Sequence, residues 1–258
     1  MYPRLVIDLK KVKNNLDRIT EMVKGSGCSL MIVTKGASAD MEVYKLLNES
    51  DIDYIADSRI QNLKKYEGTG KERVLLRLPM NSETDQVVKY ADISLNSELK
   101  TIRNLDEAAK KQGKVHKIIL MIDLGDLREG IFFKNEDEIF NAVEEILKLK
   151  NIELFGIGVN LTCYGAVIPK KDNLSILVEI ARKIEKKFGI KLQMISGGNS
   201  SSIHLIGKGE LPEGINNLRV GEAFLLGGET AYSQKLKGFF DDAFTLEAEI
   251  IELKEKQS

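Results

Sequence analysis

Lys35 is the residue of this sequence whose position best suits covalent chemistry. It follows the apolar run CSLMIVT, residues 28–34, which is typical of a buried strand. Because withdrawal from water lowers the pKa of a lysine and leaves its amine free to attack a carbonyl carbon, we expect Lys35 to form a Schiff base in a partly desolvated site. An ordinary surface lysine at a strand end is the alternative.

Two glycine-rich segments late in the chain suit the binding of a phosphate group. The first, ISGGNSSS, contains Asn199 and Ser200, and the second, RVGEAFLLGG, contains Gly221 and Glu222. Glycines let backbone amides approach a ligand closely, and the asparagine and serine side chains add donors at the start of a short helix. Each segment taken alone also suits a tight connection between a strand and a helix.

Two arginines are candidates for binding an anion or a ring nitrogen. Arg128 lies in DLGDLREG, and Arg219 lies at the end of a late apolar run. A guanidinium can fix a carboxylate or another acceptor through its fork of donors. Acidic residues near them in sequence, such as Asp123, Asp126 and Glu222, leave open a purely structural ion pair for either arginine.

The elements that must position these residues are short apolar runs separated by charged segments of helical period. Eight runs of this kind predict a closed (β/α)8 TIM barrel of the α/β class, with an open doubly wound sheet as the alternative. In such barrels the residues after each strand form the active site, and the loops after strands seven and eight commonly bind phosphate. The runs cover residues 28–34, 53–56, 73–78, 92–95, 117–123, 153–159, 192–195 and 217–220.

The helical segments and the two ends of the chain complete the predicted organisation. Apolar residues recur at helical spacing in residues 98–112, 135–150 and 174–188, and residues 8–23 predict an extra helix ahead of the barrel. Residues 245–253 alternate like a strand that must pair with a neighbouring strand, a second chain or a further domain. We therefore predict a barrel domain over residues 1–240, with residues 241–258 forming either the start of a truncated β domain or a tail.

The composition argues against several classes of partner. The chain has 258 residues, and its 38 basic and 39 acidic residues nearly cancel, so we expect no nucleic-acid partner and no membrane partner. Neither a signal peptide nor a membrane-spanning run is visible, and we expect a cytoplasmic protein. The two cysteines and two histidines are isolated from one another, so we expect no metal site.

Five motifs together resemble those of a known family. TKGASAD, DLGDLREG, GIGVNL, SGGNSS and RVGEAFLLGG resemble, in order and spacing, the motifs of the alanine racemase family of barrels, and most of all its ornithine racemase branch. The resemblance implies pyridoxal 5′-phosphate (PLP) as the cofactor, held on Lys35 as a Schiff base. It also implies racemisation of a small amino acid by proton exchange at Cα, and a homodimer. The segment TLEAEIIELKEK resembles the start of the family's second, β-rich domain.

The resemblance also implies roles for individual residues. Lys35 resembles the base on one face of the substrate, Arg219 the partner of the pyridine nitrogen, and Arg128 the residue near the phenolic oxygen and the substrate carboxylate. An arginine at the ring nitrogen leaves that nitrogen unprotonated, which favours simple proton exchange at Cα. The other implied cofactor contacts are Asn160 against the ring and Asn199, Ser200, Gly221 and Glu222 around the phosphate.

Two departures from the family pattern keep other functions open. Ala39 stands where the family has a phosphate-binding tyrosine, and the family's second base is a tyrosine from the second domain of a partner subunit. This chain alone is therefore expected to lack that base. The alternatives are a single-domain PLP-binding protein of cofactor homeostasis and an aldolase or other phosphate-handling barrel that uses Lys35 without PLP.

Overall fold

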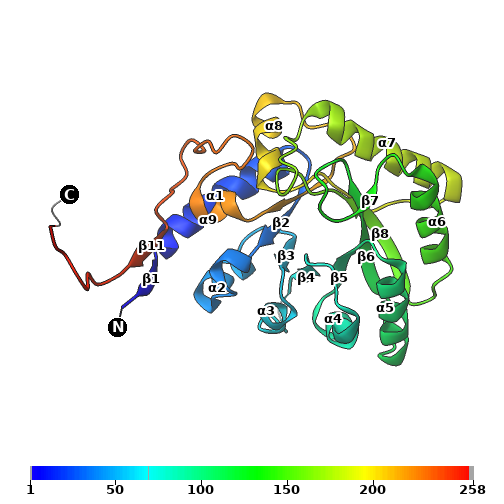
Figure 1. The fold of residues 1–258 in the computed structure, drawn as a ribbon, viewed down its shortest axis with the longest axis horizontal. Helices are drawn as coiled ribbons and strands as arrows, with labels where there is room; N and C mark the ends of the chain where they lie inside the picture. Colours follow the sequence, from blue (N-terminus) through cyan, green and yellow to red (C-terminus); the bar gives the residue numbers. More distant parts are fainter. Residues whose placement is uncertain (1, 69, 256–258) are drawn as a thin grey trace.

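Eight parallel strands close into a barrel in the computed structural model, which describes residues 2–68 and 70–255 (Figure 1). Around the barrel the strands follow the order β5-β4-β3-β2-β10-β9-β8-β6, and a further pairing of β5 with β6 closes the ring. Each strand overlaps one of the eight predicted runs, so the predicted TIM barrel is confirmed and the open sheet is wrong. The strands are β2 (Ser29–Val33), β3 (Tyr54–Asp57), β4 (Glu72–Leu75), β5 (Ile93–Asn96), β6 (His116–Asp123), β8 (Ile152–Gly158), β9 (Met194–Ser196) and β10 (Asn217–Val220).

Alternate residues of these strands point to opposite sides of the barrel wall. Because successive side chains of a strand face opposite ways, one set fills the interior and the other packs under the helices. On β5, for example, Ile93 and Leu95 point inward, while Ser94 and Asn96 point outward. The interior cluster consists of Met31, Val33, Ala56, Val74, Ile93, Leu95, Ile119, Met121 and Met194.

Helices form a layer outside the strands (Figure 1). The four helical segments predicted from the sequence are confirmed as α1, α5, α6 and α7. Asp8 begins α1 by accepting hydrogen bonds from the amides of Lys10 and Lys11, at 3.0 and 3.2 Å. No helix within the described residues is long and apolar enough to cross a membrane. The helices are α1 (Leu9–Gly25), α2 (Met41–Glu49), α3 (Ile60–Lys64), α4 (Thr84–Tyr90), α5 (Leu99–Lys111), α6 (Glu136–Leu147), α7 (Lys171–Phe188), α8 (Ile203–Lys208) and α9 (Glu222–Leu226).

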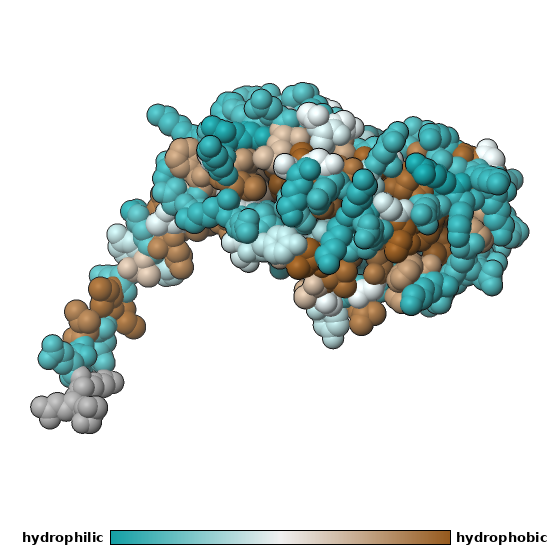
Figure 2. Space-filling model, turned by 90° about the horizontal axis from the view of Figure 1, so that it is seen from above, coloured by the Kyte–Doolittle hydropathy of each residue, from teal (hydrophilic) through white to brown (hydrophobic). Residues whose placement is uncertain are grey.

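The strand predicted at residues 245–253 is shorter than expected and pairs within the chain. The structure has β11 (Phe244–Glu247) antiparallel to β1 (Arg4–Ile7), a strand that the sequence analysis did not predict. Since β1 offers only four residues to pair with, the ladder ends at Glu247, and residues 248–255 form neither strand nor helix. This ribbon and the segment after it project from the barrel as an arm with exposed apolar side chains (Figure 2), including Leu246, Ile250, Ile251 and Leu253.

Candidate active site

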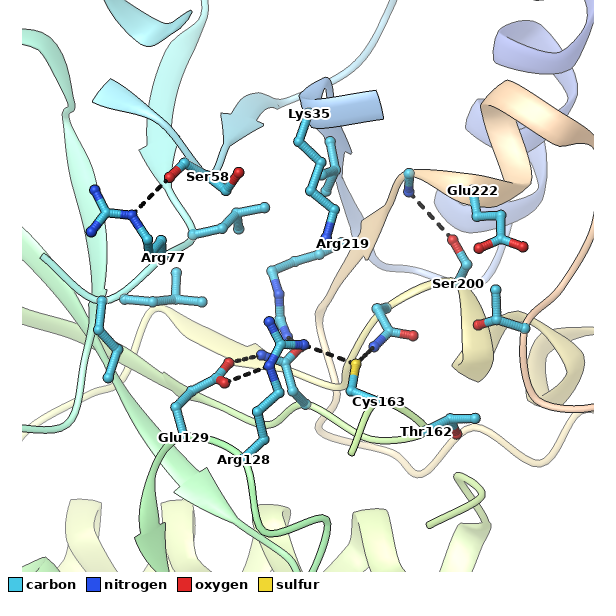
Figure 3. Close-up of a pocket in the computed structure, with 18 residues that line it drawn as sticks. Lys35, Ser58, Arg77, Arg128, Glu129, Thr162, Cys163, Ser200, Arg219 and Glu222 are labelled. Carbon is cyan, nitrogen blue, oxygen red and sulfur yellow. Dashed lines mark hydrogen bonds and ion pairs between the residues drawn. The ribbon is translucent and has the colours of Figure 1, made fainter. Parts of the chain in front are cut away.

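A cavity of about 580 Å³ opens at the carboxyl ends of the barrel strands (Figure 3). This volume lies in the range of small-molecule sites. Its lining comes from loops that follow strands on every side of the barrel, so residues far apart in sequence meet there. All eight residues selected from the sequence line it, namely Lys35, Arg128, Asn160, Asn199, Ser200, Arg219, Gly221 and Glu222.

Lys35 lies directly after β2, at the start of a short 3-10 turn, and its side chain reaches into the cavity (Figure 3). The preceding residue is firmly held, because the Thr34 hydroxyl donates to Asp57 Oδ2 at 2.8 Å. In the described part of the chain Lys35 Nζ makes no hydrogen bond or ion pair. The prediction of a desolvated amine is wrong for this structure, because Lys35 is exposed at the open mouth of the barrel.

Arg219 lies on β10 and is buried beneath the cavity, with 2% of its surface exposed. Its guanidinium donates to Ser196 Oγ, to the Val159 carbonyl and to Asn160 Oδ1, each at 2.6 Å. Desolvation lowers the pKa of Arg219 to about 10, against the opposing effect of the negative charge of Glu129. The side chain therefore stays charged at neutral pH. Its Nε–H has no acceptor among the described residues and can serve a ligand.

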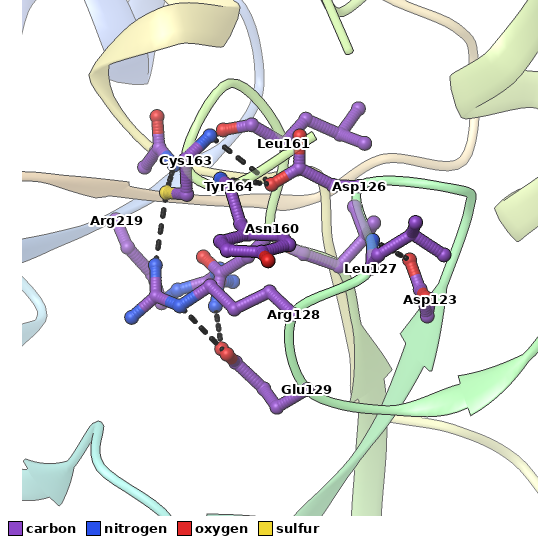
Figure 4. Close-up of polar contacts among 12 residues, drawn as sticks. Asp123, Asp126, Leu127, Arg128, Glu129, Asn160, Leu161, Cys163, Tyr164 and Arg219 are labelled. Carbon is purple, nitrogen blue, oxygen red and sulfur yellow. Dashed lines mark hydrogen bonds and ion pairs between the residues drawn. The ribbon is translucent and has the colours of Figure 1, made fainter. Parts of the chain in front are cut away.

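A chain of polar contacts connects Arg219 to Arg128 (Figure 4). Asn160 accepts from Arg219 through Oδ1 and donates through Nδ2 to Glu129 Oε1. The other oxygen of Glu129 pairs with Arg128 Nε at 2.8 Å, and Arg128 also contacts Cys163 Sγ at 2.9 Å. Neither Glu129 nor Cys163 was predicted from the sequence as a site residue. For Glu129 a signal existed, since it follows Arg128 within the DLGDLREG motif.

Asp123 and Asp126 hold the loops of the cavity and do not pair with either arginine (Figure 4). Asp123 Oδ1 accepts from the amides of Gly125 and Leu127. Asp126, fully buried, accepts from three amides of the loop after β8, at Cys163, Tyr164 and Val167, over 2.9–3.1 Å. The alternative in which these two aspartates neutralise Arg128 is therefore wrong, and Glu129 takes that role.

The two glycine-rich segments meet at one end of the cavity. Ser200 Oγ accepts from the backbone amides of Gly221 and Ala223, both at 3.3 Å. Asn199 Oδ1 accepts from the Ser201 amide at 2.9 Å and starts the following 3-10 turn. Gly198 is required there, since its φ is +107° and an added Cβ would lie 2.8 Å from Ser202 Oγ. Hydroxyl and backbone donors are thus gathered where the sequence predicted a phosphate site.

The comparison with known families agrees with the motifs. Residues 7–227 match the family described as alanine racemase, N-terminal domain. The chain belongs to this family. Over the whole chain it is 54% identical to the ornithine racemase of Acetoanaerobium sticklandii and 38% identical to the lysine racemase of Thermotoga maritima. It spans 72% of the length of each of these relatives. The predicted family and its ornithine racemase branch are thereby confirmed.

Solved structures show the same fold at much lower sequence identity. The alanine racemase of Clostridium difficile 630 superposes with a TM-score of 0.72 at 21% identity, over 95% of this chain. The chain spans 63% of the length of that protein. A D-threonine aldolase from Filomicrobium marinum gives the same TM-score at 13% identity. The alanine racemase barrel is therefore shared with a protein of another named activity, and the fold alone does not choose the reaction.

The one departure of this alanine racemase domain at its phosphate site has a structural explanation. Ala39, where a tyrosine was expected from the family pattern, is buried at 1% exposure and does not line the cavity. It follows Ser38, and both residues have positive φ values, 50° and 56°. The side chain of Ala39 packs in the core cluster and not against the cavity. The hydroxyl groups that do line it belong to Ser58, Thr162, Ser200 and Thr230.

Proposed function

We propose that this chain is the PLP-binding barrel of an amino-acid racemase whose substrate is a diamino acid such as ornithine or lysine. The observation that carries the proposal is the placing of Lys35, an amine without a partner in the described chain, in one cavity with Arg219 and the Ser200–Gly221 contact. The choice of a diamino acid rests on the two relatives named ornithine racemase and lysine racemase, which align over the whole chain.

The cavity fits PLP in three respects. It offers an amine for the aldehyde, a hydroxyl and backbone donors for the phosphate, and a buried guanidinium with an unused N–H for a ring nitrogen. The residues that would hold the cofactor are Lys35, Asn160, Asn199, Ser200, Arg219, Gly221 and Glu222. Bound PLP supplies an aldehyde that condenses with amines and a ring that delocalises negative charge from Cα.

The residues of the chain supply the binding and proton chemistry. Arg128 binds the substrate carboxylate through the part of its guanidinium that Glu129 and Cys163 leave free. Arg219 donates a hydrogen bond and keeps its proton, because a guanidinium rarely gives one up. Lys35 Nζ takes the Cα proton on one face and can return it there. Inversion needs a second base on the opposite face, which the family pattern assigns to a partner subunit.

A division at residue 240, a homodimer and a cytoplasmic location belong to the same proposal. The β1–β11 ribbon lies apart from the barrel (Figure 1) and supports a separate unit that begins near residue 241. In this proposal the domain of residues 1–240 binds the cofactor, although its first strand, β1, lies outside the barrel and pairs with β11. Residues 241–258 lead into a β-rich unit that covers the cavity of a second copy.

An absorption spectrum of the protein incubated with PLP tests the proposal. Wild type and Lys10→Ala, which removes an exposed lysine of α1, should show the visible band of a lysine-bound cofactor, and Lys35→Ala should lose it completely. A band that persists in Lys35→Ala would move the attachment to another lysine. Deuterium exchange at Cα is then measured with ornithine, lysine, alanine and serine. Binding without exchange of any of them would favour the cofactor-homeostasis alternative.

A further inference from the structure

We propose that Glu129 is a positioning residue that aligns both arginines of the cavity from a single carboxylate. This inference rests on the proposed function and adds a residue to it. Glu129 has 13% of its side chain exposed and uses both oxygens, one for Arg128 Nε at 2.8 Å and one for Asn160 Nδ2. No other carboxylate is in contact with either guanidinium in the described part of the chain.

The contact with Asn160 carries the effect of Glu129 to Arg219. The three acceptors of Arg219 are all neutral groups, so its buried charge has no direct counter-ion. A carboxylate beyond Asn160 fixes which way the amide faces, because a flipped amide would set its NH2 against the guanidinium and its oxygen against the carboxylate. With the amide held, its oxygen points at Arg219, and the negative charge lies one residue away.

The contact of Glu129 with Arg128 leaves one terminal nitrogen of that guanidinium free to bind a ligand. Glu129 takes Nε, and the other terminal nitrogen lies 2.9 Å from Sγ of Cys163, a residue whose backbone amide donates to Asp126. The remaining terminal nitrogen has no partner among the described residues and faces no competing carboxylate. A side chain that is 42% exposed is thereby given one orientation before any ligand binds.

Glu129 also contributes to the net charge of the cavity that it shares with Lys35. Its negative charge offsets that of one of the two arginines. Replacing it by a neutral amide of the same shape makes the cavity more positive by one charge, which disfavours a proton on the nitrogen that joins a bound cofactor to the protein. The other charged or titratable groups that line the cavity are Arg77, Arg128, Cys163, Arg219 and Glu222.

The test is a pH titration of the visible absorption band of the PLP-loaded protein. Glu129→Gln should move the midpoint down by about one pH unit or less, because Glu129 and Lys35 lie on opposite sides of the cavity (Figure 3) and only a charge in close contact shifts a midpoint by about one to three units. Asn160→Ala breaks the link to Arg219 but keeps the charge, so its shift should be smaller. Glu145→Gln, which removes an exposed carboxylate paired with Arg103 on the outer surface, is the matched control and should not shift it.

The outcomes separate this inference from the proposed function. A wild-type band together with an unchanged midpoint in Glu129→Gln would overturn the role of Glu129 alone. A larger shift in Asn160→Ala than in Glu129→Gln would also overturn it, because the effect would then not come from the carboxylate. Absence of any visible band in the wild type would refute the proposed function, and this inference with it.

Discussion

The two walls of the cavity differ in where their polar side chains point. The arginine wall, formed by Arg128, Glu129, Asn160 and Arg219, presents a connected set of hydrogen bonds to the cavity (Figure 4). The lysine wall, formed by Val33, Lys35, Ser58, Leu76, Arg77, Leu78 and Leu95 after β2 to β5, presents mainly apolar surface and one amine without a partner in the described chain. Arg77 on this wall is already paired, since its Nη2 lies 2.6 Å from Oε1 of Glu83.

The strands of the lysine wall do carry polar groups, but on their outer side. Thr34 bonds to Asp57 there, and Ser94 bonds to both His116 and Asn96, at 2.8 Å in each case. The hydrogen bonds of the arginine wall thus fix the side chains that face a ligand. Those of the lysine wall fix the strands behind Lys35. A rigid cofactor suits the first wall, and a movable amine suits the second.

The largest expected effect compares the two arginines of the arginine wall. Arg219→Ala should lower the free energy of unfolding by about 4 kcal/mol, because three acceptors, two of them in buried contacts, lose their donors and face a void. Arg128→Ala should cost no more than about 1 kcal/mol, since 42% of its side chain is exposed and solvent screens its ion pair with Glu129. Urea unfolding of the protein without cofactor measures both. If both variants lost the same unfolding free energy, the buried and the exposed arginine would contribute equally to stability. The difference predicted between them would then be wrong.

A smaller effect concerns His116, the first residue of β6, whose ring contacts Ser94 on the outer side of the lysine wall. Burial lowers the pKa of His116 from 6.5 to about 4 in the folded protein, so the unfolded chain takes up the proton first as the pH falls. The stability contributed by the neutral imidazole is therefore present above pH 6.5 and lost towards pH 4. Between pH 7 and pH 5 the free energy of unfolding should fall by about 2 kcal/mol from this group.

Two variants isolate the contribution of His116 to the pH dependence of unfolding. His116→Gln, which keeps a partner for Ser94, should flatten the decrease below pH 6.5. His204→Gln removes the other histidine of the chain and is the control. Urea unfolding is repeated from pH 8 to pH 4.5 for each variant. If the unfolding free energy of His116→Gln fell with pH as steeply as that of the wild type, protonation of His116 would not be the cause of the decrease.

The sequence predicted the barrel because its strands are buried on both faces. Such strands read as apolar runs with little alternation, and eight of them alternating with helical segments have few other solutions. Once the barrel was assumed, residues that follow the strands had to meet at one end. This is why Lys35, Arg128, Asn160, Ser200 and Arg219, spread over nearly 200 residues, were predicted together and line one cavity.

The sequence analysis missed features that depend on contacts between loops. Glu129 and Asp126 lie three residues apart with different roles, one binding Arg128 and the other binding amides of the loop after the neighbouring strand β8. No local pattern distinguishes two carboxylates in one loop. The exposure of Lys35 was misjudged for a similar reason, because the desolvation of a barrel mouth depends on what covers it. Strand β1 was missed because its partner lies 240 residues away.

The smallest expected effect tests whether the lysine wall acts from its outer side. Thr34→Val keeps the shape of the side chain but leaves Asp57 Oδ2 without the hydroxyl, which should cost about 1.5 kcal/mol of unfolding free energy. Thr34→Ser should restore most of it. If this contact fixes the backbone ahead of Lys35, the valine variant should also bind PLP covalently several-fold more slowly, because the amine samples more orientations.

The arginine wall shares no contact with Thr34, so the variant should leave non-covalent binding of the cofactor unchanged. Stopped-flow absorption separates the two steps, since binding depends on PLP concentration and bond formation at Lys35 does not. A valine variant that loses stability but reacts at the wild-type rate would show that the outer contact serves folding only. Slower reaction with full recovery in Thr34→Ser would tie the reactivity of the amine to a hydrogen bond on the far side of its strand.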